Sequence, residues 1–164
     1  MSNKPTKYFG KYRGEVTDNQ DPLNLGRVRA KVLTIYGEND SGWALPSVPY
    51  AGPSVGFFFI PPIGAKVWIE FEAGNPDVPI WSGCFWGSGD TPKSPALPDV
   101  KIIKTASATL TLDDSPGAGS ITIENTSDLK IVMDSSGIEL STSSSKIKLS
   151  PGSVSINDGA LEVV

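Results

Sequence analysis

The sequence predicts an all-β chain, with a small barrel in its first half and a rod of short strands in its second half. Three observations lead to this prediction. The 17 Gly and 14 Pro among 164 residues interrupt the chain too often for long helices. Apolar and polar residues alternate in several short segments, as they do in half-buried strands. All Trp, Tyr and Phe residues lie between Tyr8 and Trp86, so the two halves differ in composition.

The barrel is predicted over residues 8–87. Three segments alternate strictly, and their inward residues are expected to be Tyr12, Gly14 and Val16, then Val28, Ala30 and Val32, then Val67, Ile69 and Phe71. Two apolar runs, 56–60 and 79–85, supply two further strands, and turn-forming residues separate all of them. Five strands in about eighty residues fit an OB-type barrel, although the composition fits an SH3-like barrel nearly as well.

Three further segments complete the predicted organisation. Residues 1–7 form an N-terminal arm. Residues 88–104 are rich in Gly, Pro and Ser, which predicts a linker stiffened by its prolines. The rod then occupies residues 105–164.

The rod is predicted from a unit of three residues, apolar–polar–apolar, whose starts lie 7 to 11 residues apart. Turn-forming residues separate the units, and such an internal repeat is typical of a solenoid. The middle residue is polar in every unit except at Val132. The apolar positions, which we expect to form the core of the rod, are Leu110, Leu112, Ile121, Ile123, Ile131, Met133, Ile138, Leu140, Ile147, Leu149, Val154, Ile156, Leu161 and Val163.

Three chains are expected to share this core. A solenoid made from one chain would complete roughly two coils here, fewer than the three or more repeats that bury a continuous core. Three copies wound about a common axis would bring each apolar side chain against its equivalents. We therefore favour an intertwined, trimeric, triple-stranded β-helix, and a loosely paired β-meander is the alternative.

The composition argues against most enzyme chemistry. His is absent, which removes the commonest general base, the usual Ser and Cys triads and most zinc sites. Cys84 is single, so neither an intrachain disulfide nor a Cys-based metal cluster is expected. We expect no catalytic residue, no metal and no cofactor. The polar N-terminus and the lack of a long apolar run predict a protein made in the bacterial cytoplasm without a signal peptide.

Binding of single-stranded nucleic acid is the nearest alternative function. A stacking platform could form from Trp43, Trp68, Trp81, Trp86, Phe57 and Phe58. The net charge of −4 opposes contact with phosphates, so no nucleic-acid partner is expected and these aromatics are assigned to the core and to protein interfaces. A sugar-binding receptor fibre is a second alternative, but the far end of the rod carries no aromatic residue.

Two polar motifs have simpler explanations than a catalytic site. Asp113 and Asp114 point apart if they lie at the end of a strand, so capping of a turn is favoured over metal binding. The Ser/Thr run 141–145 has no base to activate a serine, and a solvated turn explains it better.

The order of several motifs adds a family resemblance. In the first half these motifs are Gly14-Glu15-Val16, Asp21-Pro22, Gly26-Arg27-Val28-Arg29, Trp43-Ala44-Leu45-Pro46, the run 56–72, the run 74–80, and Gly83. They resemble the OB-fold domain of central spike proteins from contractile injection systems, the phage baseplate assembly protein V and VgrG group. Segments 104–107 and 112–117 resemble the opening of that family's trimeric β-helix, and 156–163 resembles its closing segment.

The resemblance implies the structural central spike of a phage tail, type VI apparatus or phage-tail-like particle. It implies a homotrimer that attaches to a hub protein of the baseplate or tube and transiently pierces the target membrane. The lysozyme insertion and the His-x-His iron site of some members are missing here, so neither property is carried over. Val163 and Val164 are expected to contact a separate PAAR-type tip protein, and the assembled protein is expected in a virion or a secreted particle.

Overall fold

The computed structural model describes residues 6–93, 95–117 and 119–163, and it divides into two compact units, Met1–Asp90 and Thr91–Val164. Strands dominate both units. In the part of the chain that the structure describes, the helices are one turn of α-helix, α1 (Leu33–Tyr36), and a short 3-10 helix, η1 (Glu72–Gly74). The prediction of an all-β chain is therefore confirmed. Within the described residues, no helix has the length and apolar character needed to cross a bilayer.

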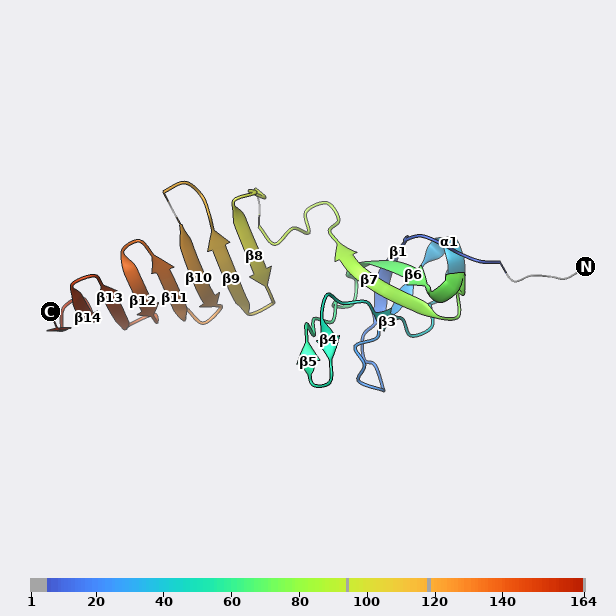
Figure 1. The fold of residues 1–164 in the computed structure, drawn as a ribbon, viewed down its shortest axis with the longest axis horizontal. Helices are drawn as coiled ribbons and strands as arrows, with labels where there is room; N and C mark the ends of the chain where they lie inside the picture. The colour runs from blue at the N-terminus through green and yellow to red at the C-terminus, as the bar shows by residue number, and fades with distance from the viewer. Residues whose placement is uncertain (1–5, 94, 118, 164) are drawn as a thin grey trace, which may run out of the picture. The chain divides into compact units, whose positions relative to one another are not determined.

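The first unit contains a five-stranded sheet with the order β2-β1-β6-β7-β3 (Figure 1). Its neighbours are antiparallel except for β3 and β7, which run parallel. The strands are β1 (Tyr12–Asp18), β2 (Arg29–Lys31), β3 (Leu45–Pro46), β6 (Lys66–Phe71) and β7 (Pro79–Phe85). A separate hairpin pairs β4 (Ala51–Gly52) with β5 (Val55–Gly56).

The core of this unit is enclosed by one chain. The buried hydrophobic side chains are Val16, Val28, Ala30, Val32, Ala44, Val67, Ile69, Phe71 and Trp81. Eight of the nine residues expected to face inward are buried, and Tyr12 is partly buried against the same cluster. These inward faces are confirmed, because strict alternation in a strand places every second side chain on one face.

The predicted strand 56–60 is wrong. Only Gly56 belongs to a strand, and residues 57–60 continue as irregular chain. The three consecutive side chains Phe57, Phe58 and Phe59 are 54%, 70% and 59% exposed. A run of aromatic residues has high strand propensity, but it forms a strand only when a partner strand and a core lie beside it.

A buried ion pair organises the loop between β1 and β2. The carboxylate of Asp21 accepts hydrogen bonds from the backbone N–H groups of Leu23, Leu25 and Arg27 and from the guanidinium of Arg27, whose Nη2 lies 2.6 Å away. This guanidinium, assisted by the backbone donors, holds the pKa of the Asp21 carboxyl far below its usual range. Arg27 in turn lies over the ring of Trp43 at 5.6 Å. Three of the motifs that carried the family resemblance thus contact one another.

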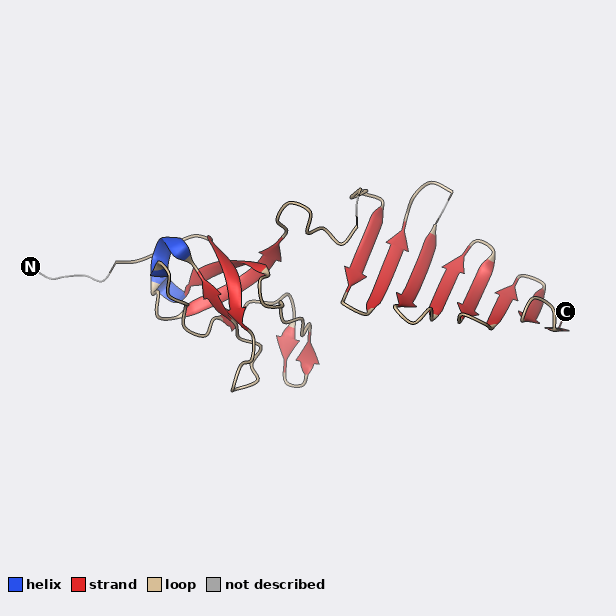
Figure 2. Cartoon of the chain, turned by 180° about the vertical axis from the view of Figure 1, so that it is seen from behind, coloured by secondary structure: helices blue, strands red, loops and turns tan. Residues whose placement is uncertain are grey.

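The second unit is one eight-stranded antiparallel sheet in which each strand pairs with its neighbours in sequence (Figures 1 and 2). We call it the ladder. Its strands are β8 (Val100–Lys104), β9 (Ala108–Asp113), β10 (Ser120–Asn125), β11 (Lys130–Asp134), β12 (Gly137–Ser141), β13 (Lys146–Ser150), β14 (Ser153–Ile156) and β15 (Leu161–Val163). The strands shorten from six residues in β9 and β10 to three in β15, so the ladder tapers toward the C-terminus.

The ladder begins before residue 105, where the sequence predicted the start of the rod. Strand β8 lies inside the segment predicted as linker, and its Ile103 pairs with Leu110 of β9. The irregular connection therefore ends at Asp99. The linker 88–104 was predicted from its overall content of Gly, Pro and Ser. The Gly/Pro-rich residues 88–99 dominated that content and concealed the five residues of β8.

One glycine of the ladder has no substitute. Gly137 starts β12 with a φ of +135°, and a Cβ atom there would overlap the carbonyl oxygen of Leu149 in β13. Both the backbone conformation and the close approach of the two strands require glycine.

Candidate assembly interface

The strand register sorts the predicted core positions into two rows on one face of the ladder. Directly paired residues of an antiparallel sheet point to the same side. The first row follows the pairings of Leu110, Ile123, Ile131, Leu140, Ile147, Ile156 and Leu161. The second row follows those of Leu112, Ile121, Met133, Ile138, Leu149, Val154 and Val163. We call these two rows the apolar face.

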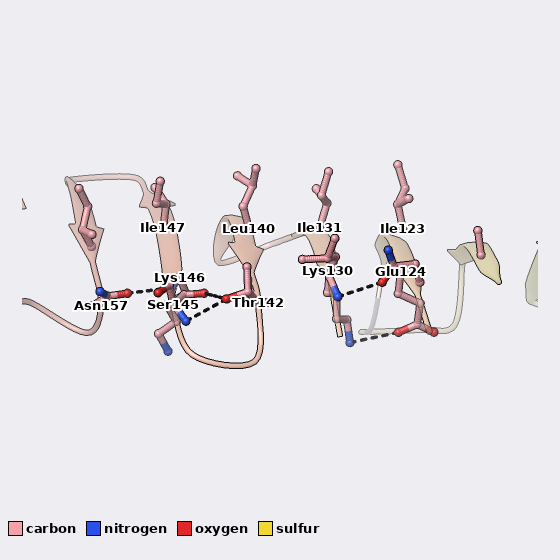
Figure 3. Close-up of a pocket in the computed structure, with 15 residues that line it drawn as sticks. Ile123, Glu124, Lys130, Ile131, Leu140, Thr142, Ser145, Lys146, Ile147 and Asn157 are labelled. Atoms are coloured by element: carbon pink, nitrogen blue, oxygen red, sulfur yellow. Dashed lines mark hydrogen bonds and ion pairs between the residues drawn. The ribbon is translucent and has the colours of Figure 1, made fainter. Parts of the chain in front are cut away.

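Within one chain the apolar face is uncovered. Twelve of the fourteen side chains are 36–61% exposed, and Leu110 and Ile156 are half-buried. Figure 3 shows Ile123, Ile131, Leu140 and Ile147 side by side on the same side of the sheet. No described residue from 91 to 163 reaches full burial, so the ladder has no core of its own.

The opposite face of the ladder is polar. Its middle row pairs Thr111, Thr122, Val132, Glu139, Lys148 and Ser155 in succession. Glu139 lies directly opposite Lys148, and Lys130 lies 3.9 Å from Glu124. This is the outward face that the apolar–polar–apolar unit predicts.

Side-chain hydrogen bonds fix the turns along one margin of the apolar face (Figure 3). Asn157 Oδ1 accepts the backbone N–H of Lys146 at 2.9 Å, and Thr142 Oγ1 accepts that of Ser145 at 3.1 Å. The ammonium group of Lys146 lies 2.5 Å from Asp158, which raises the pKa of the lysine. These polar groups satisfy the chain reversals and leave the two rows free of charge along this margin.

Strand β8 brings a charged residue to the first strand of the ladder. Ile103 extends the first row, but Lys101 stands opposite Leu112 in the second row. Its ammonium forms an ion pair with Asp114. Sequence reasoning missed both residues, because the repeat was counted only from Leu110. The adjacent isoleucines Ile102 and Ile103, just after the Pro-rich segment, were the available signal.

The other predicted motifs lie apart from this face. Asp113 Oδ1 accepts the backbone N–H of Ser115 at 2.9 Å, which confirms a turn-capping role. Ser143 and Ser144 lie in an exposed turn. Val163 is 61% exposed in β15, and Val164 lies outside the described residues. No group of three His, Cys, Asp or Glu suited to a metal occurs in the described part of the chain.

The aromatic residues weighed as a stacking platform have several environments. Trp81 is in the core, and its Nε1 donates to the carbonyl of Gly26 at 3.1 Å. Trp68 packs on Phe85 with ring centroids 4.6 Å apart, and Arg13 lies over both rings. The exposed side chains Trp86, Phe57 and Phe58 remain uncovered within their unit. The core and the cation stacks therefore account for only part of the set.

The barrel encloses its own core, whereas the ladder leaves its apolar face bare within one chain. Residues 12–86 match the family described as the type VI secretion system/phage-baseplate injector OB domain, and residues 100–162 match the phage baseplate V C-terminal trimerisation domain. The chain belongs to the phage baseplate V and VgrG-like proteins, which have a structural spike role in contractile injection systems. The family resemblance read from the motifs is thereby confirmed, and the OB-type barrel is favoured over the SH3-like alternative.

A segment of 55 residues is 42% identical to the actin cross-linking toxin VgrG1 of Vibrio cholerae. The segment is 34% of this chain but 5% of the toxin. The likeness therefore concerns a small part of that protein, and its cross-linking activity is not carried over to this chain.

Proposed function

We propose that this chain forms the central spike of a contractile injection particle as a homotrimer. In this proposal the barrel attaches to a hub protein of the baseplate or tube, and the ladder forms the piercing end. The observation that carries the proposal is the apolar face, which a single chain leaves bare from Leu110 to Val163, over most of the trimerisation domain.

Three ladders can bury this face against one another. Completing the burial of one partly exposed Ile, Leu, Val or Met contributes about 1 kcal/mol, so the fourteen residues of the apolar face contribute roughly 10 kcal/mol per chain before ordering costs. The face carries no charge between Leu110 and Val163, so three copies meet without repulsion. The polar rows of the opposite face then meet water.

The strand pairing of the ladder also suits a protein that bears mechanical force along its axis. Every ladder strand except the two at the ends has hydrogen-bonded neighbours on both sides, which leaves few free edges. Eight strands at about 4.8 Å spacing give a rod on the order of 35 Å long per trimer. The taper toward β15 narrows the end that would meet the membrane first.

Two further partners follow from the same proposal. A PAAR-type tip protein would cover the side chain of Val163 in β15, which is otherwise exposed. The finished trimer would be found in a virion or a secreted particle. The charge of −4 and the employment of several barrel aromatics in packing support a protein partner over nucleic acid.

Analytical ultracentrifugation of the full chain tests the proposal. We expect a species of three 17.3 kDa chains at micromolar concentration, with slow unfolding. Electron microscopy of the native particle, with an antibody to the barrel, should then place the protein at the leading end of the tube. A folded monomer at micromolar concentration would contradict the trimer, and label elsewhere on the particle would contradict the spike.

A further inference from the structure

The barrel unit carries an exposed apolar surface that its own fold does not use. It consists of Tyr50, Val55, Phe57, Phe58 and Phe59, which are 53–70% exposed, and we call it the aromatic patch. The patch residues belong to the β4–β5 hairpin or adjoin it in sequence, and the hairpin lies away from α1 within the same unit (Figure 1). Four exposed aromatic rings present about 400 Å² of apolar surface, which is in the range of the largest patches on monomeric proteins, and such patches are often functional.

The hairpin within the patch is poorly supported by its own unit. Each of its strands has two residues, and an isolated two-stranded hairpin is only marginally stable in water. Phe57 N–H donates to the carbonyl of Tyr50 at 2.9 Å, and the ring of Phe58 lies over Gly26. These contacts fix the loop at its base and leave its aromatic rings exposed. A partner that covered these rings would remove their apolar surface from water.

The chemistry of the patch fits a second copy of itself. The groove around the aromatic patch is lined only by uncharged residues, among them Asn24, Val48 and Trp81. By contrast, a fifth of the residues in the whole chain are charged. A partner recognised through charge would have to leave its own ions unpaired there. Another barrel of this protein presents the same uncharged, aromatic surface and adds no like-charge contact.

The size of the patch explains why it needs the ladder. A stable interface buries about 800 Å² on each partner, roughly twice what the aromatic patch offers. The connection Thr91–Asp99 tethers each barrel to the trimerisation domain and spans at most about 30 Å. Tethering on this scale raises the effective concentration of neighbouring barrels to about the millimolar range, where a weak contact forms.

We propose that the aromatic patches of the three barrels pack against neighbouring barrels of the same trimer. This inference rests on the proposed trimer and adds a second contact between chains, made by the barrels and dependent on the ladder. The patch would close the barrel end of the trimer, and Phe58 would be its centre because it is the most exposed of the five side chains.

Photocrosslinking of the purified full-length protein tests this contact without any other protein present. The variant Phe58→p-benzoylphenylalanine places the probe in the patch, and the variant Leu33→p-benzoylphenylalanine places it on α1, where Leu33 is 60% exposed. After irradiation we expect covalently joined chains on a denaturing gel from the first variant, and at least tenfold fewer from the second. A third variant, Phe58→Asp, should still sediment as a trimer while hydrogen exchange accelerates in residues 50–60.

The outcomes separate this inference from the trimer on which it rests. A trimer that gives no interchain product from position 58 would overturn the barrel contact and leave the spike intact, with the patch free for a different protein. Equal products from both probes would show random collisions and would also overturn it. A protein that sediments as a monomer would overturn both proposals together.

Discussion

The barrel and the ladder are both built from antiparallel strands, but they obtain their cores differently. The barrel buries nine hydrophobic residues within one chain, whereas the described part of the ladder buries none. The barrel therefore has a stability that one chain can supply. In the proposed trimer, the stability of the ladder would come from the assembly and would depend on protein concentration. The same kind of strand thus serves a domain in one half and an interface in the other.

The two halves can be followed separately in one sample. All four Trp residues lie in the barrel unit, between Trp43 and Trp86. Tryptophan fluorescence therefore reports on the barrel, and sedimentation reports on assembly through the ladder.

The largest effect is expected from a charge on the apolar face. Ile147→Asp would place three carboxylates together in the core of the trimer, where an unpaired charge costs several kcal/mol. We expect the trimer to be lost at micromolar concentration in sedimentation, with barrel fluorescence little changed. Ser143→Asp adds the same charge in an exposed turn and should leave the trimer intact. Equal behaviour of the two variants would contradict the assignment of the faces.

The converse change should affect only the barrel. Ile69 is fully buried, and Ile69→Ala is expected to lower the free energy of unfolding of the barrel by about 2–5 kcal/mol. Denaturant titration followed by fluorescence would measure this loss, while the ladder should still hold three chains together. The matched control is Ile63→Ala, at a position 64% exposed, with an expected effect below about 0.5 kcal/mol. Loss of the trimer in Ile69→Ala would show that assembly needs an intact barrel.

A backbone change should weaken the ladder without adding charge. In Gly137→Ala, the new Cβ would overlap the carbonyl oxygen of Leu149, and alanine disfavours the positive φ at this position. We therefore expect the trimer to lose more than about 1 kcal/mol of stability. The measurement is the dissociation of the trimer on dilution. Gly152→Ala has open space at its Cβ and should behave like the parent protein. If both variants dissociated at the same concentration, the close approach of β12 and β13 would not matter for assembly.

Acid should destabilise the barrel through Asp21. The pKa of Asp21 is lowered in the folded state. Its contribution to the free energy of unfolding is therefore complete above the ordinary Asp pKa of about 3.9 and is lost as the pH falls below that value. Fluorescence-detected unfolding between about pH 5 and pH 2 would measure the decline. In Asp21→Asn the free energy of unfolding should be lower at neutral pH and should change less across this range. An unchanged slope would assign the acid sensitivity to other carboxylates.

The smallest expected effect is an absence of binding. A labelled single-stranded oligonucleotide should show no change in fluorescence anisotropy with the trimer near physiological salt. Trp68 and Phe85 are stacked under Arg13, which leaves their faces less accessible to bases. Micromolar binding that weakens as salt rises would instead make the barrel a nucleic-acid module.

Strand periodicity determined how much of this structure could be predicted. Val28, Ala30 and Val32 were placed correctly because alternation records which face of a strand is buried. The two rows of the ladder could be predicted for the same reason, although the register that aligns Ile138 with Leu149 is visible only in the structure. The segment 57–60 could not be predicted correctly, because propensity favours a strand and only tertiary context shows that no partner strand is present. Strand β8 was hidden by the composition around it.

Pairing between successive strands has a consequence for how the molecule forms. Each ladder strand bonds to the strands that precede and follow it in the chain, so its contacts are local in sequence and can form without a long search. A single ladder gains little from doing so, because its apolar face stays in water. The slow event is then the meeting of three chains, and the rate at which spikes mature should rise steeply with the concentration of newly made subunits.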